Sequence, residues 1–257
     1  MQTAALAALD LAREWSYEAI DIPPADFPEL TAALPNEGFV GANVTIPHKQ
    51  AALEIAAERS AASNEIGAAN TLSFTESGIR ADNTDAPGLL AALPEPPADR
   101  RALVLGAGGS ARAATWALAS QGARVEVWNR SPERAEELAS SLARFAAEAG
   151  TITAVTAKQV EAAEYAVIVN CTPVGMADST GGPFEQLPLQ VDRLERAIVV
   201  DFAYAGEETE LVRAGRAAGA RVVDGLEILV RQGAESLRIW TGREPPLEVM
   251  REAAAAP

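Results

Sequence analysis

The chain has 257 residues, of which 48% are hydrophobic, enough for one large globular domain or two of ordinary size. Its formal net charge of −15 argues against nucleic acid and anionic membrane surfaces as partners. No apolar run reaches the ~18 residues that a membrane-spanning helix needs, and no signal-peptide pattern follows Met1. We therefore predict a cytoplasmic protein. The chain has a single cysteine, Cys171, and so cannot form an internal disulfide. We predict that Cys171 is a small buried apolar residue.

The first eighty or so residues combine helical and strand patterns in one α/β unit. Alanine and leucine at helical spacing predict a first helix, and alternating apolar and polar residues predict strands that end at proline or turn residues. The predicted helices cover 4–15, 26–34 and 50–59, and the predicted strands cover 17–22, 39–46, 69–74 and 78–81.

A second unit follows a proline-rich boundary. A helix over 85–93 leads out of the first unit, and Pro94-Glu95-Pro96-Pro97 is the clearest linker in the chain. Strands and helices then alternate, which predicts a parallel sheet covered on both faces. The predicted strands are 102–105, 125–128, 152–155, 165–170, 197–202 and 221–223, and the predicted helices are 110–120, 132–149 and 208–218.

Two helical segments, 226–240 and 246–254, come after the last predicted strand. With no further strand to reach, they are expected to pack back on the first unit. This predicts an α/β fold of two lobes with a ligand cleft between them. The predicted parts are a substrate domain over 1–93, a dinucleotide-binding domain of the Rossmann type over 94–225, and returning helices over 226–257.

A glycine turn between the strand at 102–105 and the following helix is typical of dinucleotide binding. Gly106 suits the tight turn, and Gly108 lets the backbone approach a diphosphate at the helix N-terminus. The next strand ends in Asn129-Arg130-Ser131, with Arg134 one turn further, where an NAD-selective site would carry Asp or Glu. Arginines there favour the 2′-phosphate of NADP, although both could simply be solvated. The predicted cofactor loop is Gly106, Ala107, Gly108, Gly109 and Ser110.

Three polar loops of the first unit could carry acid/base chemistry. They are 43–49, 70–71 and 82–85, and their candidate proton-transfer groups are Lys49, Asp85, Asp82 and His48. A lysine held by a carboxylate can protonate a developing alkoxide. Lys49 could equally be a solvated loop residue, and Asp82 or Asp85 an N-cap of the next helix. We expect His48 to have a packing role.

Other kinds of active site lack sequence support. The chain has no HExxH motif, no cysteine pair and no clustered His/Asp set, so no metal site is predicted. It also lacks the GxSxG motif of a serine nucleophile.

Taken together, these motifs closely resemble those of the shikimate dehydrogenase family. The match covers nearly the whole chain in the family's order. In the first lobe the matching segments are 41–49, 67–71 and 82–85 with Gly88; in the rest of the chain they are 106–110, 129–134, 170–176, 224–225 and 232–234.

The resemblance implies an enzyme that interconverts shikimate and 3-dehydroshikimate with NADP, on the route to aromatic amino acids. Lys49 would be the acid/base residue with Asp85 as its partner, and Thr45, Asn70, Asp85, Tyr204 and Gln232 would contact the substrate. The cofactor would contact the glycine loop and Asn129, Arg130, Ser131, Arg134, Thr172, Phe202 and Gly225. The enzyme would be a monomer or homodimer. The alternatives are a quinate/shikimate dehydrogenase and a non-catalytic NADP-binding homologue.

The start of the chain departs from the family pattern. Family members begin with a strand and a Ser-x-Ser-Pro turn whose hydroxyls hold the substrate carboxylate, whereas Met1 here falls where the following helix has begun. We expect that the natural chain begins upstream. The chain as written is then expected to bind NADP but to bind shikimate weakly, and its first lobe to be the less stable.

Overall fold

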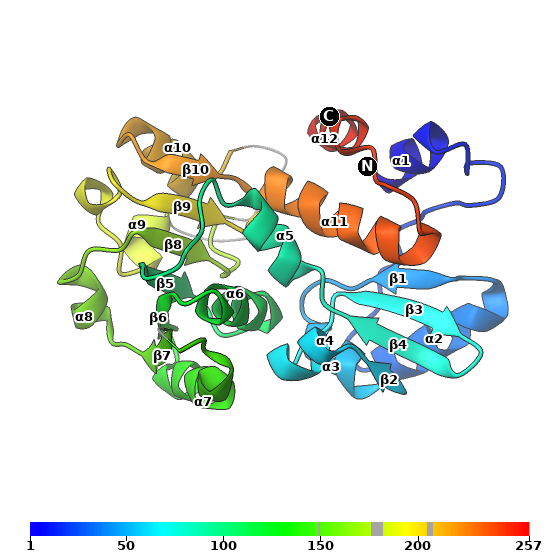
Figure 1. Ribbon diagram of the computed structural model, residues 1–257, viewed down its shortest axis with the longest axis horizontal. Helices are drawn as coiled ribbons and strands as arrows, with labels where there is room; N and C mark the ends of the chain where they lie inside the picture. The colour runs from blue at the N-terminus through cyan, green and yellow to red at the C-terminus, as the bar shows by residue number, and fades with distance from the viewer. Residues whose placement is uncertain (149, 176–181, 205–207, 257) are drawn as a thin grey trace. The chain divides into compact units, whose positions relative to one another are not determined.

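The computed structural model describes residues 1–148, 150–175, 182–204 and 208–256. The chain forms two compact units (Figure 1). Unit 1 comprises Met1–Gly88 and Leu229–Pro257, and unit 2 comprises Leu89–Ile228. The chain therefore leaves unit 1 once and returns to it with its last residues.

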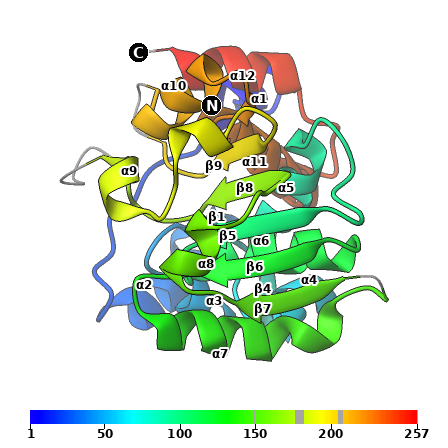
Figure 2. The same ribbon diagram turned by 90° about the vertical axis from the view of Figure 1, so that its left-hand side faces the viewer.

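Unit 2 contains a six-stranded sheet in which every neighbouring pair of strands is parallel. The strand order is β10-β9-β8-β5-β6-β7, and Figure 2 shows β9, β8, β5, β6 and β7 side by side in this order. Successive strands run outward from β5 in one direction and from β8 in the other, so the order reverses between β5 and β8. The strands are β5 (Arg101–Leu105), β6 (Arg124–Trp128), β7 (Thr151–Ala154), β8 (Val167–Asn170), β9 (Ile198–Asp201) and β10 (Arg221–Val223).

Every residue of β8 and β9 is buried, as expected for central strands covered on both faces. On one face Leu103, Ile168 and Val199 share a core with Leu211 of a helix. Proline at N1 starts the helix at Pro132, and the Thr209 hydroxyl caps the helix at Glu210. The helices of unit 2 are α6 (Gly109–Ser120), α7 (Pro132–Leu142), α8 (Ala157–Glu161), α9 (Pro183–Gln186) and α10 (Glu210–Ala217), with 3-10 turns at Ala143–Phe145 and Val191–Arg193.

Unit 1 contains a four-stranded mixed sheet with the order β1-β3-β4-β2. Strands β3 and β4 form a hairpin, β1 pairs antiparallel with β3, and β2 pairs parallel with β4. Its core joins Leu72 and Ala81 of the sheet to Phe27 and Ala52 of the helices. The strands are β1 (Gly41–Asn43), β2 (Glu58–Arg59), β3 (Thr71–Thr75) and β4 (Gly78–Asp82).

Helices from both ends of the chain complete unit 1. Helix α1 packs against α12, and Figure 1 shows α11 beside β1, where the Trp240 indole donates to the Leu72 carbonyl at 3.0 Å. The helices are α1 (Gln2–Ala8), α2 (Phe27–Ala33), α3 (Lys49–Glu54), α4 (Ala61–Ile66), α5 (Asp85–Ala92), α11 (Gly225–Thr241) and α12 (Leu247–Ala255), with a 3-10 turn at Leu34–Glu37. Helices α5 and α11 are the two that continue into unit 2.

The α/β class and the parallel sheet of unit 2 confirm the sequence prediction, but several elements of unit 1 differ from it. The strand predicted over 17–22 is wrong, because this segment joins neither sheet: a groove separates it from the edge strand β1. The first helix ends at Ala8, where Asp10 adopts a positive φ of 58° and turns the chain. The helix predicted over 50–59 ends at Glu54, and residues 58–59 instead join the sheet as β2. In unit 2, the helix predicted over 132–149 ends at Leu142.

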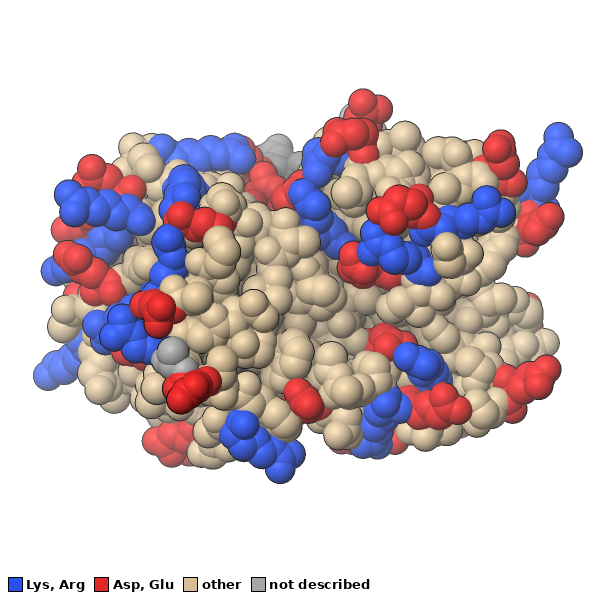
Figure 3. All heavy atoms as spheres, viewed as in Figure 1, with Lys and Arg blue, Asp and Glu red and all other residues tan. Residues whose placement is uncertain are grey.

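Charged side chains of both signs are interspersed on the visible face of each unit (Figure 3). The net charge of −15 is thus spread out rather than gathered in one acidic patch on that face. Within the described ranges, no helix combines the length and the apolarity needed to cross a membrane.

Gly41 gives a direct test of how α11 packs on the sheet. A Cβ at this position would lie 2.5 Å from the Leu72 carbonyl oxygen and against the Trp240 indole, so Gly41→Ala should displace that indole. We expect a loss of about 1–3 kcal/mol of unfolding free energy in urea denaturation, the usual cost of overpacking. The neighbouring Val40 is 51% exposed, so Val40→Ala should change stability by no more than about 0.5 kcal/mol. Equal midpoints for the two variants would refute this packing argument.

Candidate functional site

Unit 1 buries a lysine–aspartate ion pair. The Lys49 ammonium lies 2.6 Å from Asp85 Oδ2, and the two side chains are only 10% and 4% exposed. Each is the first residue of its helix, α3 or α5, so two helix starts meet at this point. A proton donor and a carboxylate that orients it are thereby placed together, as general acid–base catalysis requires.

Backbone contacts hold the two helix starts in place. The Lys49 carbonyl accepts from the Ala69 amide at 2.8 Å, which ties α3 to the residue before Asn70. At the start of α5, the Asn83 side-chain oxygen accepts from the Ala86 amide at 3.1 Å, and Asn83 donates to the Ala68 carbonyl at 2.9 Å. The side chain that accepts from this helix start is therefore Asn83, not Asp82 or Asp85 as considered from the sequence.

Asn70 connects the ion pair to two other elements. Its amide nitrogen lies 3.0 Å from Asp85 Oδ1, 3.1 Å from Gln232 Oε1 and 2.9 Å from Thr84 Oγ1. The amide has only two hydrogens for these three acceptors, so one acceptor is always available to another donor. The Asn70 oxygen accepts from the Thr84 backbone amide at 2.6 Å, which fixes the orientation of the side chain.

Gln232 reaches this cluster because α5 and α11 approach closely. A Cβ on Gly88 would lie 2.9 Å from the Gln232 backbone nitrogen, so only glycine allows this separation. Lys49, Asp85, Asn70 and Gln232, all predicted site residues, thus form one hydrogen-bonded group.

A buried hydroxyl cluster beneath Asn70 was not foreseen from the sequence. Ser236 Oγ accepts from Asn43 Nδ2 at 2.7 Å and lies 2.8 Å from the Thr71 hydroxyl and 3.2 Å from that of Thr84. Thr71, Thr84 and Ser236 are each at most 1% exposed. Ser236 lies on α11, one helical turn after Gln232, and this spacing was the one available sequence signal.

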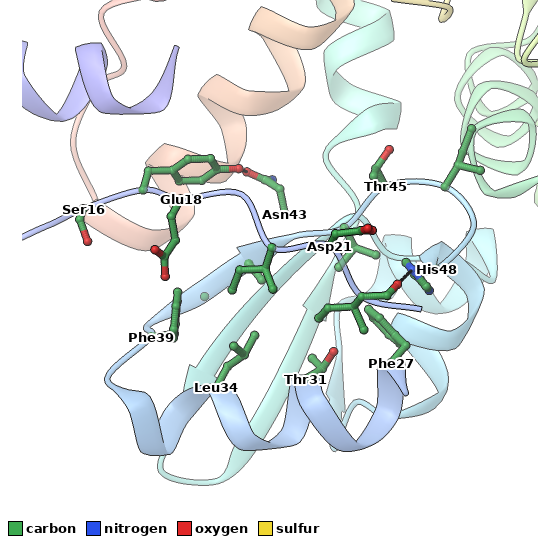
Figure 4. Close-up of a pocket in the computed structure, with 17 residues that line it drawn as sticks. Ser16, Glu18, Asp21, Phe27, Thr31, Leu34, Phe39, Asn43, Thr45 and His48 are labelled. Atoms are coloured by element: carbon green, nitrogen blue, oxygen red, sulfur yellow. Dashed lines mark hydrogen bonds between the residues drawn. The ribbon is translucent and has the colours of Figure 1, made fainter. Parts of the chain in front are cut away.

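Thr45 and His48 line a groove of about 180 Å³ between the segment 16–22 and β1, and Asn43 of the hydroxyl cluster lines it too (Figure 4). Thr45 is exposed at the edge of the groove. His48 stacks on Phe27 with ring centroids 4.4 Å apart, and its Nε2 lies 2.9 Å from the Ile22 carbonyl oxygen. These contacts agree with the packing role expected for His48. Asp82 pairs with Arg80 rather than with Lys49.

In unit 2 the glycine turn lies at the end of β5. Gly106 has a positive φ of 108°, and α6 follows with Gly108 as its N-cap. Nothing lies within 4 Å of a Cβ placed on Gly108, whose φ of −89° any residue could adopt. A side chain there would fill open space over the helix N-terminus, where a diphosphate would bind. The residues therefore fit a dinucleotide.

The next strand end carries the predicted specificity residues. Arg130, Ser131 and Arg134 are exposed around the start of α7, and Asn129 donates to the Ser131 carbonyl at 3.0 Å. Both arginines are accessible to an anion at this edge of the sheet. Guanidinium groups suit a phosphate, with which they form charge-assisted and bidentate hydrogen bonds.

Four further predicted residues follow the ends of β8, β9 and β10. The Thr172 hydroxyl donates to Asn170 Oδ1 at 2.7 Å, Phe202 is half-buried, and Tyr204 is exposed. Gly225 is buried against the Ala203 carbonyl, leaving no room for a Cβ. Met176, the last residue of the 170–176 motif, lies outside the described residues.

Comparison with family models accounts for most of the chain. Residues 1–72 match a shikimate dehydrogenase substrate binding domain, residues 92–207 match shikimate/quinate 5-dehydrogenase, and residues 225–255 match the shikimate 5′-dehydrogenase C-terminal domain. The chain belongs to the shikimate dehydrogenase family.

Individual family members agree over nearly their full length. The shikimate dehydrogenase (NADP(+)) of Methanocella arvoryzae is 40% identical over 259 residues, which cover 99% of this chain and 91% of that protein. The shikimate 5-dehydrogenase of Thermus thermophilus, solved in complex with NADP(H) and shikimate, is 37% identical with a TM-score of 0.82, covering 98% and 91% of the two chains. The shikimate dehydrogenase of Aquifex aeolicus is 31% identical with a TM-score of 0.85, covering 100% and 91%.

In this shikimate dehydrogenase family member, Ser236 and Ser73 offer a matched test of the hydroxyl cluster. Ser236→Ala removes a hydroxyl with several partners and should cost about 1–3 kcal/mol of unfolding free energy, because buried partners lose their hydrogen bonds. Ser73 Oγ is buried with no hydrogen-bond partner among the described residues, so Ser73→Ala should be neutral or slightly stabilising. Urea denaturation would measure both. A Ser236→Ala midpoint no lower than that of Ser73→Ala would contradict the cluster.

Proposed function

We propose that this protein is an NADP-dependent shikimate dehydrogenase that interconverts 3-dehydroshikimate and shikimate, with Lys49 and Asp85 as its acid–base pair. The observation that carries the proposal is the buried 2.6 Å ion pair between Lys49 and Asp85, which Asn70 links to Gln232 by hydrogen bonds. The chain that holds this pair belongs to the shikimate dehydrogenase family. Relatives named shikimate dehydrogenase (NADP(+)) that span nearly the whole chain support the activity and the cofactor.

NADP supplies the hydride donor and acceptor for the carbonyl–alcohol interconversion. The turn at 106–110 would hold its diphosphate at the N-terminus of α6, and Asn129, Arg130, Ser131 and Arg134 would bind the adenosine end with its 2′-phosphate. Thr172, Phe202 and Gly225 would lie along the rest of the cofactor.

Lys49 moves the proton in the proposed reaction. In the reducing direction its ammonium donates a proton to the oxygen of the former carbonyl, and in the oxidising direction the neutral amine accepts the hydroxyl proton. Asp85 holds the lysine Nζ in one position and balances its charge. Thr45, Asn70, Asp85, Gln232 and Tyr204 would fix the substrate hydroxyls through hydrogen bonds.

The finer proposals concern partners and location. We propose that small molecules are the ligands and that neither nucleic acid nor membrane is a partner, which the net charge of −15 supports. We also propose that the protein works in the cytoplasm as a monomer or homodimer, and gel filtration would distinguish the two states.

Two alternatives are separated by a substrate comparison. A quinate/shikimate dehydrogenase would turn over quinate, and its NAD-preferring form is disfavoured by Arg130 and Arg134. A non-catalytic homologue would bind NADP without turnover. Steady-state assays with shikimate or quinate, each with NADP or NAD, should show the highest kcat/KM for shikimate with NADP.

Lys49→Ala should lower kcat by about 10²–10⁴, the usual contribution of a positioned acid or base, while the Kd for NADP stays nearly unchanged. Stopped-flow and steady-state absorbance at the nicotinamide band would measure the loss. Lys158, the chain's other lysine, is exposed in α8, so Lys158→Ala is a matched control that should keep full activity. Near-normal kcat in Lys49→Ala would remove this residue from the mechanism.

Arg130→Asp should weaken NADP binding far more than NAD binding. A charge-assisted contact with the 2′-phosphate, about 1.5–3 kcal/mol, would become a repulsion, so the NADP/NAD ratio of kcat/KM should fall at least ~10-fold. Arg196→Asp makes the same charge change at an exposed position just before β9 and should leave the ratio unaltered. An unchanged ratio in Arg130→Asp would show that the arginine does not contact the 2′-phosphate.

A further inference from the structure

A buried aspartate outside the proposed machinery sits among the residues predicted to bind ligands in unit 2. Asp201 is the last residue of β9 and is fully buried, as is Asn170, its register partner on β8. Asn170 Nδ2 donates to Asp201 Oδ1 at 2.9 Å. The two residues are the last of neighbouring strands. They lie next to the point between β5 and β8 where the strand order reverses. In parallel sheets, ligands bind at this edge.

Three donors from the described residues converge on the Asp201 carboxylate. Besides Asn170, the Ala203 backbone amide donates to Oδ1 at 2.9 Å, and the Thr209 hydroxyl donates to Oδ2 at 2.6 Å. No cationic side chain pairs with Asp201 within the described ranges. Burial raises the pKa of Asp201, while the bonds from Thr209, Ala203 and Asn170 oppose that rise. The carboxylate is thus held by uncharged donors. Each of these hydrogen bonds requires an acceptor atom at position 201.

Asn170 extends the network to a second turn. Its oxygen accepts from the Thr172 amide at 3.1 Å and from the Thr172 hydroxyl at 2.7 Å, and its nitrogen also donates to the Val174 carbonyl at 3.2 Å. All four hydrogen-bonding positions of Asn170 are therefore filled. The side chain can neither flip nor rotate without breaking hydrogen bonds to the turn after β8 and to Asp201 of β9.

Asp201 also fixes the turn that follows β9. Ala203 is held on both sides, because its amide donates to Asp201 and its carbonyl packs against Gly225. Phe202 and Tyr204 flank this fixed residue, and the Phe202 amide donates to the Asn170 carbonyl at 2.8 Å. Thr209, which completes the carboxylate shell, also caps α10.

We propose that Asp201 is a positioning residue of this enzyme: through Asn170 and Ala203, its carboxylate holds the turns of Thr172 and of Phe202–Tyr204 in the geometry that ligand binding requires. The inference rests on the proposed function, since it takes Thr172, Phe202 and Tyr204 as ligand contacts. Asp201 itself, buried beneath the turns, touches neither substrate nor cofactor.

The test compares Asp201→Ala with Asp201→Asn. The alanine removes every acceptor, so the Kd and KM for NADP should rise about 10-fold or more at temperatures where the variant is fully folded, as expected for ligand groups displaced by ~1 Å. The asparagine keeps an oxygen for Ala203 and Asn170, and its amide can donate to a rotated Thr209 hydroxyl. It should therefore restore both constants to within about 3-fold of the parent. Asp192→Ala, at an exposed position of the same unit, should change neither.

A purely structural role predicts a different result. Asp201→Ala would then lower the melting temperature but leave the Kd and KM for NADP of the folded protein unchanged, and this outcome would overturn the proposal. If Asp201→Ala does not fold, Thr209→Val and Thr209→Ser replace it. Loss of the hydroxyl should raise the NADP Kd and the serine should restore it, and equal constants in the two variants would also overturn the proposal.

The two proposals fail separately. Absence of shikimate turnover in the parent protein would refute the proposed function, while NADP affinity, measured by fluorescence titration, would still test Asp201. Normal turnover in the parent with unchanged NADP affinity in Asp201→Ala would refute the positioning role alone.

Discussion

The buried ion pair between Lys49 and Asp85 is the interaction on which the organisation of unit 1 depends. Removing two charges from water is costly, and their attraction repays the cost only where the geometry is good and the remaining oxygens are satisfied. Here Asp85 Oδ1 accepts a hydrogen bond from the Asn70 side chain, whose oxygen in turn accepts from the Thr84 amide. Such a pair adds little stability over an apolar replacement, so its presence is better explained by chemistry than by folding.

That constraint reaches elements far from the pair. Asn70 binds Gln232 of α11, and Ser236 of the same helix joins Asn43 of β1 to the hydroxyls of Thr71 and Thr84. A buried polar network is favourable only when all of its members form their hydrogen bonds. The elements that carry them must therefore be correctly positioned at the same time. The glycines at 41 and 88 remove the side chains that would keep α11 at a greater distance.

In unit 2, the turns that follow the strands are held in place in two different ways. The edge proposed to bind the cofactor consists of turns that follow parallel strands. The glycine turn is set by local backbone geometry, since Gly106 has a positive φ. The turns after β8 and β9 are instead held by Asn170 and Asp201, two side chains that bond across the strand ends. Precision in binding loops commonly depends on such a supporting layer.

The sequence by itself determined the features that depend on short-range physics. The Gly106 turn and the alternation of strands and helices in unit 2 were predictable, because side-chain period and turn chemistry act over a few residues. The sequence also indicated Lys49 and Asp85 as candidates, 36 positions apart, without showing that they touch. Only the tertiary structure decided that Asp82 pairs elsewhere, that 17–22 has no strand partner, and that Ser236 meets Asn43 across 193 positions. Those outcomes depend on which buried groups find partners once distant elements pack, and no local pattern in the chain encodes that choice.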